Sequence, residues 1–133
     1  MKVMIVPCEM SVKAIVPTIR AMVSKELSKS YKLKQDDIAS LLGITQSAVS
    51  QYIGNLRGKA LDLEGVKEVE LMVKDIAYIL TMKSPPRIIC QKCCETCKII
   101  REKGMLCQLH SHIDPKFNTK GCDICIPVST KCL

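Results

Sequence analysis

The sequence is poor in aromatic residues, with three Tyr, one Phe and no Trp among 133 residues. Proteins that hold single-stranded nucleic acid usually stack its bases on aromatic side chains, so this scarcity argues against that partner. No apolar run approaches the roughly 20 residues that span a bilayer. The opening MKVMIV is interrupted at Pro7, before it reaches the length of a signal-peptide core. We therefore expect a cytoplasmic protein with no membrane association.

The sequence also lacks the common signatures of a catalytic site. It has no glycine-rich loop that would cradle a phosphate. Neither of its two histidines, His110 and His112, stands in a pattern with a nucleophile and a carboxylate. We therefore expect no enzymatic activity and no small-molecule substrate.

Charge is unevenly distributed along the chain. Residues 11–60 carry eight basic and three acidic side chains, whereas residues 61–82 carry two basic and five acidic ones. Residues 83–133 are basic again, with nine basic and four acidic side chains. A basic segment next to an acidic one favours a polyanionic partner for the first segment. Because aromatic platforms are missing, duplex DNA is the expected polyanion.

Residues 33–59, LKQDDIASLLGITQSAVSQYIGNLRGK, have the pattern of two short helices joined by a tight turn. Four positions define the pattern Q-x3-A-x3-G-x5-V: Gln35, Ala39, Gly43 and Val49. Gly43 falls where the chain must turn after a helix, a position that favours positive φ. Thr45 is suited to cap the second helix, because its hydroxyl can accept a hydrogen bond from a free backbone N–H. Ala48, Val49 and Ile53 should face inward.

The outward face of this second helix consists of amides and hydroxyls, with no carboxylate and no large apolar group. Such a face suits base edges in the major groove, where glutamine pairs with adenine through two hydrogen bonds. The expected DNA contacts are Gln35, Thr45, Gln46, Ser47, Ser50, Gln51, Asn55, Arg57 and Lys59. Among these, Gln46, Ser47 and Gln51 are expected at base edges, and Gln35, Arg57 and Lys59 on phosphates. The alternative is an ordinary helical hairpin of a small bundle.

The 33–59 segment closely resembles the helix-turn-helix of the phage-repressor and Cro superfamily (XRE type). The wider order PCE, VPTIRAMVSKEL, the 33–59 segment and a cysteine-rich end resembles a group of predicted archaeal transcriptional regulators. In that group a repressor-like helix-turn-helix precedes a C-terminal metal or iron–sulfur module. The resemblance implies binding to double-stranded DNA, and repressor-type proteins commonly bind as homodimers on two half-sites.

Helical periodicity on both sides of this segment predicts an all-α fold of four to five helices followed by a small cysteine-rich, metal-binding tail. A helix should begin at about Ser11 or Lys13, or at Pro17 if the proline lies in its first turn, after a strand or arm that ends at Pro7. A second should run from about Glu64 to Met82. Its seam would pack on the chain's own bundle or against a second subunit: Val66, Val69, Val73, Ile76 and Leu80. The predicted segments are 1–60, 61–83 and 84–133.

Eight of the nine cysteines fall within residues 90–132. Four pairs share a two-residue gap, with which a tight turn presents two ligands to one metal: Cys90 with Cys93, Cys94 with Cys97, Cys107 with His110, and Cys122 with Cys125. The repetition of this gap predicts metal binding. In the reducing cytosol, cysteines in this number are not expected to form disulfides.

Two kinds of metal site fit the spacing. Zinc would use all eight paired ligands in two tetrahedral sites, whereas an iron–sulfur cluster needs four thiolates. The expected cluster ligands are Cys94, Cys97, Cys107, Cys122 and Cys125, with Cys90, Cys93 and His110 as further candidates. One or two helical turns ended by Gly104 should bring Cys97 and Cys107 within reach of one site. The archaeal resemblance favours iron–sulfur.

The leading hypothesis is a sequence-specific, double-stranded-DNA-binding transcription regulator whose iron–sulfur tail senses redox state, oxygen or iron. One alternative is a constitutive DNA-binding protein with a structural zinc tail. Another is a thiol-redox or electron-transfer protein in which the two short helices serve only assembly.

Overall fold

The computed structural model describes residues 7–59 and 61–113, and every regular element in them is helical. These elements are α1 (Pro7–Met10), the π-helical turn η1 (Ser11–Ile15), α2 (Val16–Lys29), α3 (Gln35–Leu42), α4 (Gln46–Ile53), α5 (Lys67–Thr81), α6 (Pro86–Glu102) and α7 (Met105–Ile113). The all-α prediction is confirmed for this part of the chain. None of its helices combines the length and apolar character needed to cross a membrane. The predicted ligands Cys122 and Cys125 lie outside the described residues.

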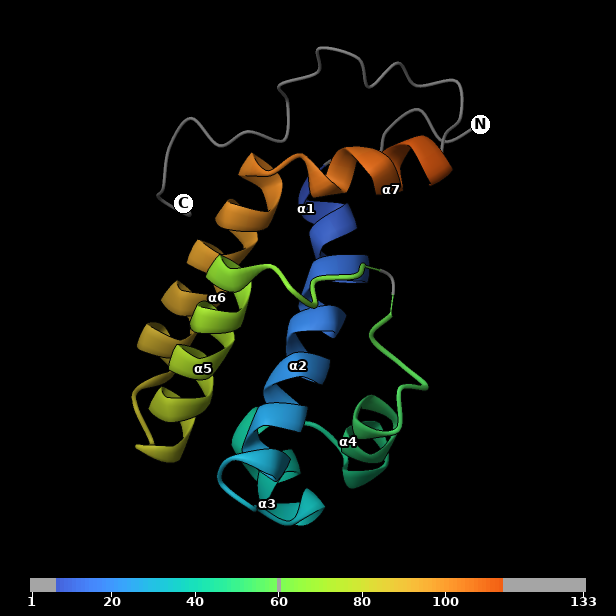
Figure 1. The fold of residues 1–133 in the computed structure, drawn as a ribbon. Coiled ribbons are helices and arrows are strands. Elements are labelled where there is room, and N and C mark those ends of the chain that lie inside the picture. Colours follow the sequence, from blue (N-terminus) through green and yellow to red (C-terminus); the bar gives the residue numbers. More distant parts are fainter. Residues whose placement is uncertain (1–6, 60, 114–133) are drawn as a thin grey trace.

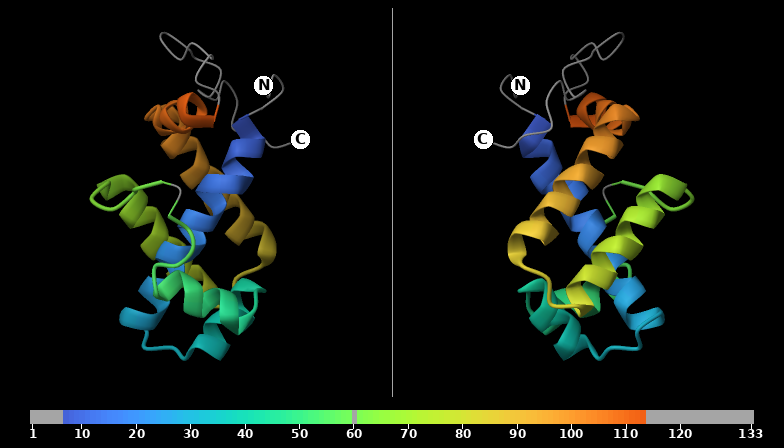
Figure 2. Two further views of the ribbon diagram at one scale, coloured as in Figure 1. Left: turned by 90° about the vertical axis from the view of Figure 1, so that its right-hand side faces the viewer. Right: turned by 90° about the vertical axis from the view of Figure 1, so that its left-hand side faces the viewer.

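One long helix forms the axis of the molecule, because α1, η1 and α2 follow one another without a break. At 1.5 Å per residue it is about 35 Å long. In Figure 1 it runs through the centre, with α5 and α6 along one side, α3 and α4 at its lower end and α7 across its upper end. Figure 2 shows from both sides that α3 and α4 lie at the end opposite α7.

The continuous helical run begins at Pro7, before the expected starts at Ser11 or Lys13, while its α-helical part α2 begins at Val16 with Pro17 in its first turn, close to the alternative start. The strand or arm expected before Pro7 lies outside the described residues. Pro17 lies in the helix interior, where it lacks an N–H and its ring crowds the preceding turn. The wide π turn accommodates it: the backbone N–H of Val16 donates to Ser11 O, five residues back. The hydroxyl of Thr18 then donates to Ala14 O, a carbonyl of the irregular turn, at 2.7 Å.

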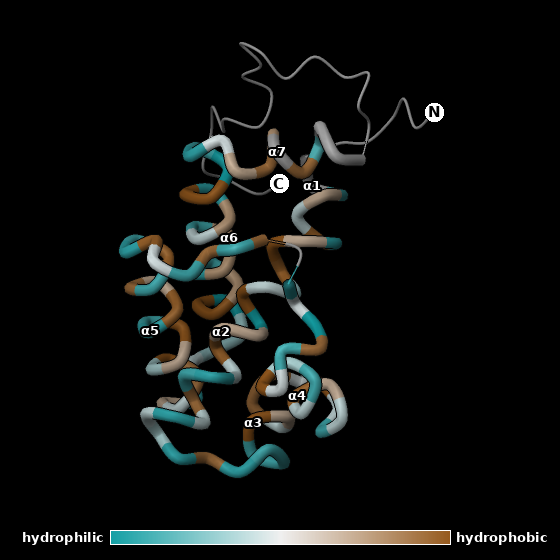
Figure 3. Tube along the Cα trace, turned by 45° about the vertical axis from the view of Figure 1, so that its right-hand side comes forward, coloured by the Kyte–Doolittle hydropathy of each residue, from teal (hydrophilic) through white to brown (hydrophobic). Residues whose placement is uncertain are grey.

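A single apolar core joins the long helix to elements from the whole described chain. Figure 3 shows apolar positions of the helices turned toward one another. The fully or almost fully buried members are Met10, Ile15, Ile19, Val23, Leu27, Ile38, Ala39, Val49, Leu63, Val69, Val73, Ile76, Ala77, Leu80, Ile100 and Leu106. Because Ile100 of α6 and Leu106 of α7 belong to this core, the described parts of the segments predicted as 1–60, 61–83 and 84–133 share one core.

The predicted seam of α5 faces this core. Val69, Val73, Ile76 and Leu80 are each less than 5% exposed and pack within their own chain. The seam is therefore not available to a second subunit, and packing on the bundle was the correct alternative. The helix begins at Lys67 rather than Glu64, because Gly65 has φ +83° and cannot continue a right-handed helix. The backbone N–H of Gly65 donates a hydrogen bond to the Glu70 carboxylate at 3.0 Å.

Gly58 lies where the segment after α4 crosses the long helix at very short distance. Its φ of +76° is in the left-handed region, and an added Cβ would lie 2.7 Å from Pro17 O and 2.8 Å from the Ala21 Cβ. Both neighbours belong to a helix that cannot shift without disturbing the core. Glycine is therefore required at this position for conformation and for space.

We expect Gly58→Ala to destabilise the protein by more than Gly65→Ala. Both substitutions force alanine into the left-handed region, at a cost of about 1 kcal/mol each. Only Gly58 meets other atoms, since an added Cβ at Gly65 has nothing within 4 Å. Urea unfolding of the two variants measures the difference, which should be about 1–3 kcal/mol from overpacking. Equal free energies of unfolding would contradict the close crossing.

Candidate nucleic-acid interface

A hydroxyl cap and a left-handed glycine position α4. Gly43 has φ +66°, as the sequence predicted, and ends α3 with its N–H on Ala39 O. Thr45 is extended and its hydroxyl accepts the Ala48 N–H at 3.1 Å. The turn between the two helices is therefore fixed at both ends by local hydrogen bonds.

The buried side of α4 consists of Ala48, Val49 and Tyr52, each less than 8% exposed. Val49 enters the main core, while Ala48 and Tyr52 pack with Ala21 of α2 in a second small cluster. Ile53 had been predicted on this side, and Tyr52 had not. Ile53 is only half-buried, whereas Tyr52 is 2% exposed. Its spacing of four from Ala48 and three from Val49 was the available signal.

The opposite side of α4 is polar and open to solvent. Gln46, Ser47, Ser50 and Gln51 are all exposed, as the sequence predicted. No carboxylate belongs to this ridge, which consists of two amides and two hydroxyls on about two helical turns. This ridge presents hydrogen-bond donors and acceptors to solvent, while the other side of α4 packs against the protein core.

Gln35 lies beside this ridge because its helix, α3, packs against α4. The side-chain amide of Gln46 donates a hydrogen bond to Gln35 Oε1. Residues eleven positions apart in the sequence are thus joined at the surface. The bond fixes the orientation of the Gln46 amide and leaves its carbonyl oxygen and second N–H for other partners.

Basic side chains border the end of α4. Arg57 and Lys59 are exposed, and the Arg57 guanidinium lies 5.4 Å from the centre of the Tyr52 ring, a cation–π distance. The Lys25 ammonium of α2 donates to Asn55 Oδ1. Sequence reasoning had not included Lys25, because only the packing of α2 against α4 brings it here.

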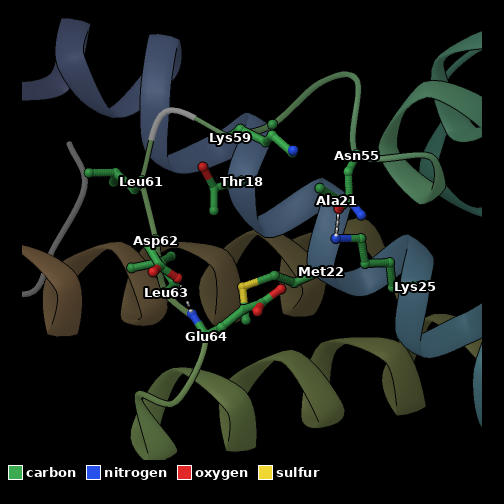
Figure 4. Close-up of a pocket in the computed structure, with 11 residues that line it drawn as sticks. Thr18, Ala21, Met22, Lys25, Asn55, Lys59, Leu61, Asp62, Leu63 and Glu64 are labelled. Carbon is green, nitrogen blue, oxygen red and sulfur yellow. Dashed lines mark hydrogen bonds between the residues drawn. The ribbon is translucent and has the colours of Figure 1, made fainter.

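A cleft of about 350 Å³ lies behind this border, between α2 and the segment that leaves α4 (Figure 4). Its lining includes Lys25 and Lys59 but also Asp62 and Glu64. Two cations and two carboxylates give the cleft no dominant sign of charge. It therefore does not extend the basic border as an anion site.

The first two cysteine pairs lie on the single helix α6, not in tight turns as their spacing had suggested. Cys93 and Cys97 are half-buried and pack against the core, while Cys90 and Cys94 are exposed. The Cys97 thiol donates to Ser11 Oγ at 3.3 Å, which ties α6 to the π turn of the long helix.

The second half of the predicted metal module also begins as helix. Gly104, with φ +71°, ends the turn after α6 as expected, and α7 then carries a half-buried Cys107 and a buried His110. Within residues 7–59 and 61–113, no three His, Cys, Asp or Glu side chains are grouped to hold a metal ion. The described thiols alone therefore do not form the predicted centre.

Burial raises the pKa of the Cys93 thiol, with a smaller upward contribution from Cys90 and a downward one from Arg20. The fold therefore favours the protonated thiol. The Cys93 thiol therefore leaves the free energy of unfolding unchanged below its unfolded-state pKa. That free energy falls as pH rises from there through the higher folded-state pKa, because the unfolded chain ionises more readily. A protonated, half-buried thiol is also a poor nucleophile.

Comparison of the chain with protein-family models, with curated proteins and with solved structures found no match.

We expect iodoacetamide at mildly alkaline pH to modify Cys90 before Cys93 in the folded protein. Cys90 is exposed, whereas Cys93 is half-buried with a raised pKa and presents less thiolate. Mass spectrometry of tryptic peptides separates the two, because Lys92 lies between them. In urea the difference should disappear. Equal rates in the folded protein would contradict the packing of α6.

Proposed function

We propose that this protein is a sequence-specific, double-stranded-DNA-binding transcription regulator that uses α3 and α4 as a helix-turn-helix. The observation that carries the proposal is the exposed amide and hydroxyl ridge of α4, held on a helix whose other side is buried. A helix fits the major groove of B-DNA, and side chains of this kind pair there with base edges. The chain acts by binding, with no catalytic step.

In this proposal α4 lies in the major groove with Gln46 and Ser47 foremost and Gln51 one turn further on. The hydrogen bond from Gln46 to Gln35 orients the Gln46 amide before DNA arrives. Less side-chain freedom is then lost on binding, which favours affinity and limits the bases that Gln46 accepts. Gln35 is thus a positioning residue for Gln46 as well as a phosphate contact.

Electrostatics support the same orientation. Arg57, Lys59 and Lys25 border the end of α4, where neighbouring phosphates would pass, and such contacts set register rather than sequence. At the start of α3, the exposed carboxylates of Asp36 and Asp37 disfavour phosphate. The phosphate contacts are therefore expected mainly from the cations beside α4.

The cysteine-rich segment is proposed to bind an iron–sulfur cluster, with zinc as the alternative metal. The described thiols of Cys94, Cys97 and Cys107 do not complete a site, so the proposal requires Cys122 and Cys125, which lie outside the described residues. A bound cluster would supply sensitivity to oxidants or iron. The helix α6 packs on both α2 and α5. A structural change caused by metal binding at its thiols would therefore act on the long helix through these contacts.

We expect the double variant Gln46→Ala, Gln51→Ala to lose sequence preference while retaining weak, salt-sensitive DNA binding. Each glutamine pair with a base is worth about 1–3 kcal/mol of discrimination, whereas the cations that contact phosphate are unchanged. Selection from a random duplex library at fixed salt, followed by sequencing, measures the preference. The wild-type protein should enrich one motif and the double variant none.

The matched control is Gln91→Ala, which removes an exposed glutamine of α6 away from the ridge. It should enrich the wild-type motif. Gln35→Ala should relax the motif at the position that Gln46 reads while leaving the rest. An unchanged motif with the double variant, or no duplex binding by the wild-type protein, would refute the proposal.

Metal analysis of anaerobically prepared protein tests the cysteine-rich segment. An iron–sulfur cluster gives a brown protein with broad visible absorption and bound iron and sulfide, whereas zinc gives a colourless one. We expect iron, and we expect the double variant Cys122→Ala, Cys125→Ala to lose it. Protein with neither metal, prepared without chelator, would contradict a metal centre.

A further inference from the structure

The outer side of α5 carries an apolar stripe that the fold does not use. Leu71 is 62% exposed, Tyr78 55% and Met82, which caps the helix, 62%. Their spacings of seven and four place them on one face. That face lies opposite the buried seam, which contains Val69 and Val73.

Most other exposed large apolar residues in the described part of the chain lie apart from this face: Val12 on η1, Tyr31 and Leu56 in connections and Ile88 on α6. Single exposed apolar side chains are common and need no explanation. Three on one face of one helix form an apolar stripe, interrupted by charged residues, and such a stripe indicates an interaction surface. The patch is also displaced from the ridge of α4, which is carried on a different helix.

Two opposite charges lie in the middle of this stripe. Lys74 and Asp75 are adjacent and exposed, and neither has an ion-pair partner among the residues that the structure describes. They fall midway between Leu71 and Tyr78. A patch that contains one cation and one anion side by side complements a second copy of itself.

We propose that α5 pairs antiparallel with α5 of a second copy, about a twofold axis that passes between Lys74 and Asp75. In an antiparallel pair with this centre, Leu71 lies opposite Tyr78 of the second copy, and Lys74 lies opposite Asp75. Each contact occurs twice, as twofold symmetry requires. The centre of the surface thus matches apolar with apolar and cation with anion, whereas Met82, at the end of the helix, lies opposite Lys67 of the second copy.

This arrangement favours a second copy over other occupants. A peptide of one charge sign would meet a like charge at either Lys74 or Asp75, and an anionic membrane surface would meet the carboxylate of Asp75. A helix of this length spans about 22 Å, at 1.5 Å per residue. Because a single pair of such helices buries little area, the dimer should be weak, with dissociation in the micromolar range.

The inference deepens the proposed function by giving the dimeric form an interface, yet its test needs no DNA. Sedimentation equilibrium in reducing buffer, which prevents intermolecular disulfides, measures the dimer dissociation constant. The wild-type protein should show a monomer–dimer equilibrium. Lys74→Glu places glutamate against Asp75 of the second copy, and Asp75→Lys places two lysines together, so each should raise the dissociation constant about tenfold.

The decisive variant combines the two changes. Lys74→Glu with Asp75→Lys exchanges the charges and restores the pair, so dimerisation should return to within about threefold of the wild-type protein. Leu71→Ser should weaken the dimer without restoring charge complementarity, and Lys29→Glu, on α2 away from this face, should leave it unchanged. Circular dichroism confirms that each variant is folded.

A wild-type protein that stays monomeric at every accessible concentration would overturn the proposal. So would a dimer that ignores the single charge variants, or one that the double exchange fails to restore. Loss of DNA preference in the Gln46 and Gln51 variants is a separate measurement. The interface and the DNA-binding proposal therefore fail independently.

Discussion

The crossing of α4 over the long helix is the constraint on which the rest of the molecule depends. Ala21 and Ala48 are small enough for the two helices to approach, and Tyr52 fills the space beside them. The chain leaving α4 then passes so close to Pro17 and Ala21 that only Gly58 fits. One side of α4 is thereby fixed, so its polar side is presented without freedom to rotate.

The irregular π turn of the long helix lies directly before the residues that Gly58 crosses, and it does not interrupt the helix. The π turn places Pro17 in the helix interior while keeping the buried stripe of α2 continuous. The same region receives α6, through the contact of Cys97 with Ser11. The polar ridge at one end and the thiols at the other are therefore attached to one rigid element. If the thiols hold a metal, that element is the physical connection between the two proposed activities.

The helix α5 buries one apolar face in the core and leaves a second, smaller apolar stripe exposed. Its seam of valines, isoleucine and leucine packs in the core of its own chain, a contact that periodicity alone had not distinguished from one with a second subunit. Periodicity identifies which residues share a face, but it does not identify the partner of that face. The remaining apolar stripe, broken by Lys74 and Asp75, became visible as a separate surface only when the seam was assigned.

The local interactions could be predicted from the sequence alone. The left-handed turn at Gly43, the cap at Thr45 and the exposed Gln46, Ser47, Ser50 and Gln51 all depend on residues a few positions apart. Long-range packing decided the rest. The pairing of Gln46 with Gln35, the approach of Lys25, the burial of Tyr52 and the helical setting of Cys90 to Cys97 depend on which helices meet. Spacing reports which side chains share a turn or a face, whereas tertiary contacts determine what that face touches.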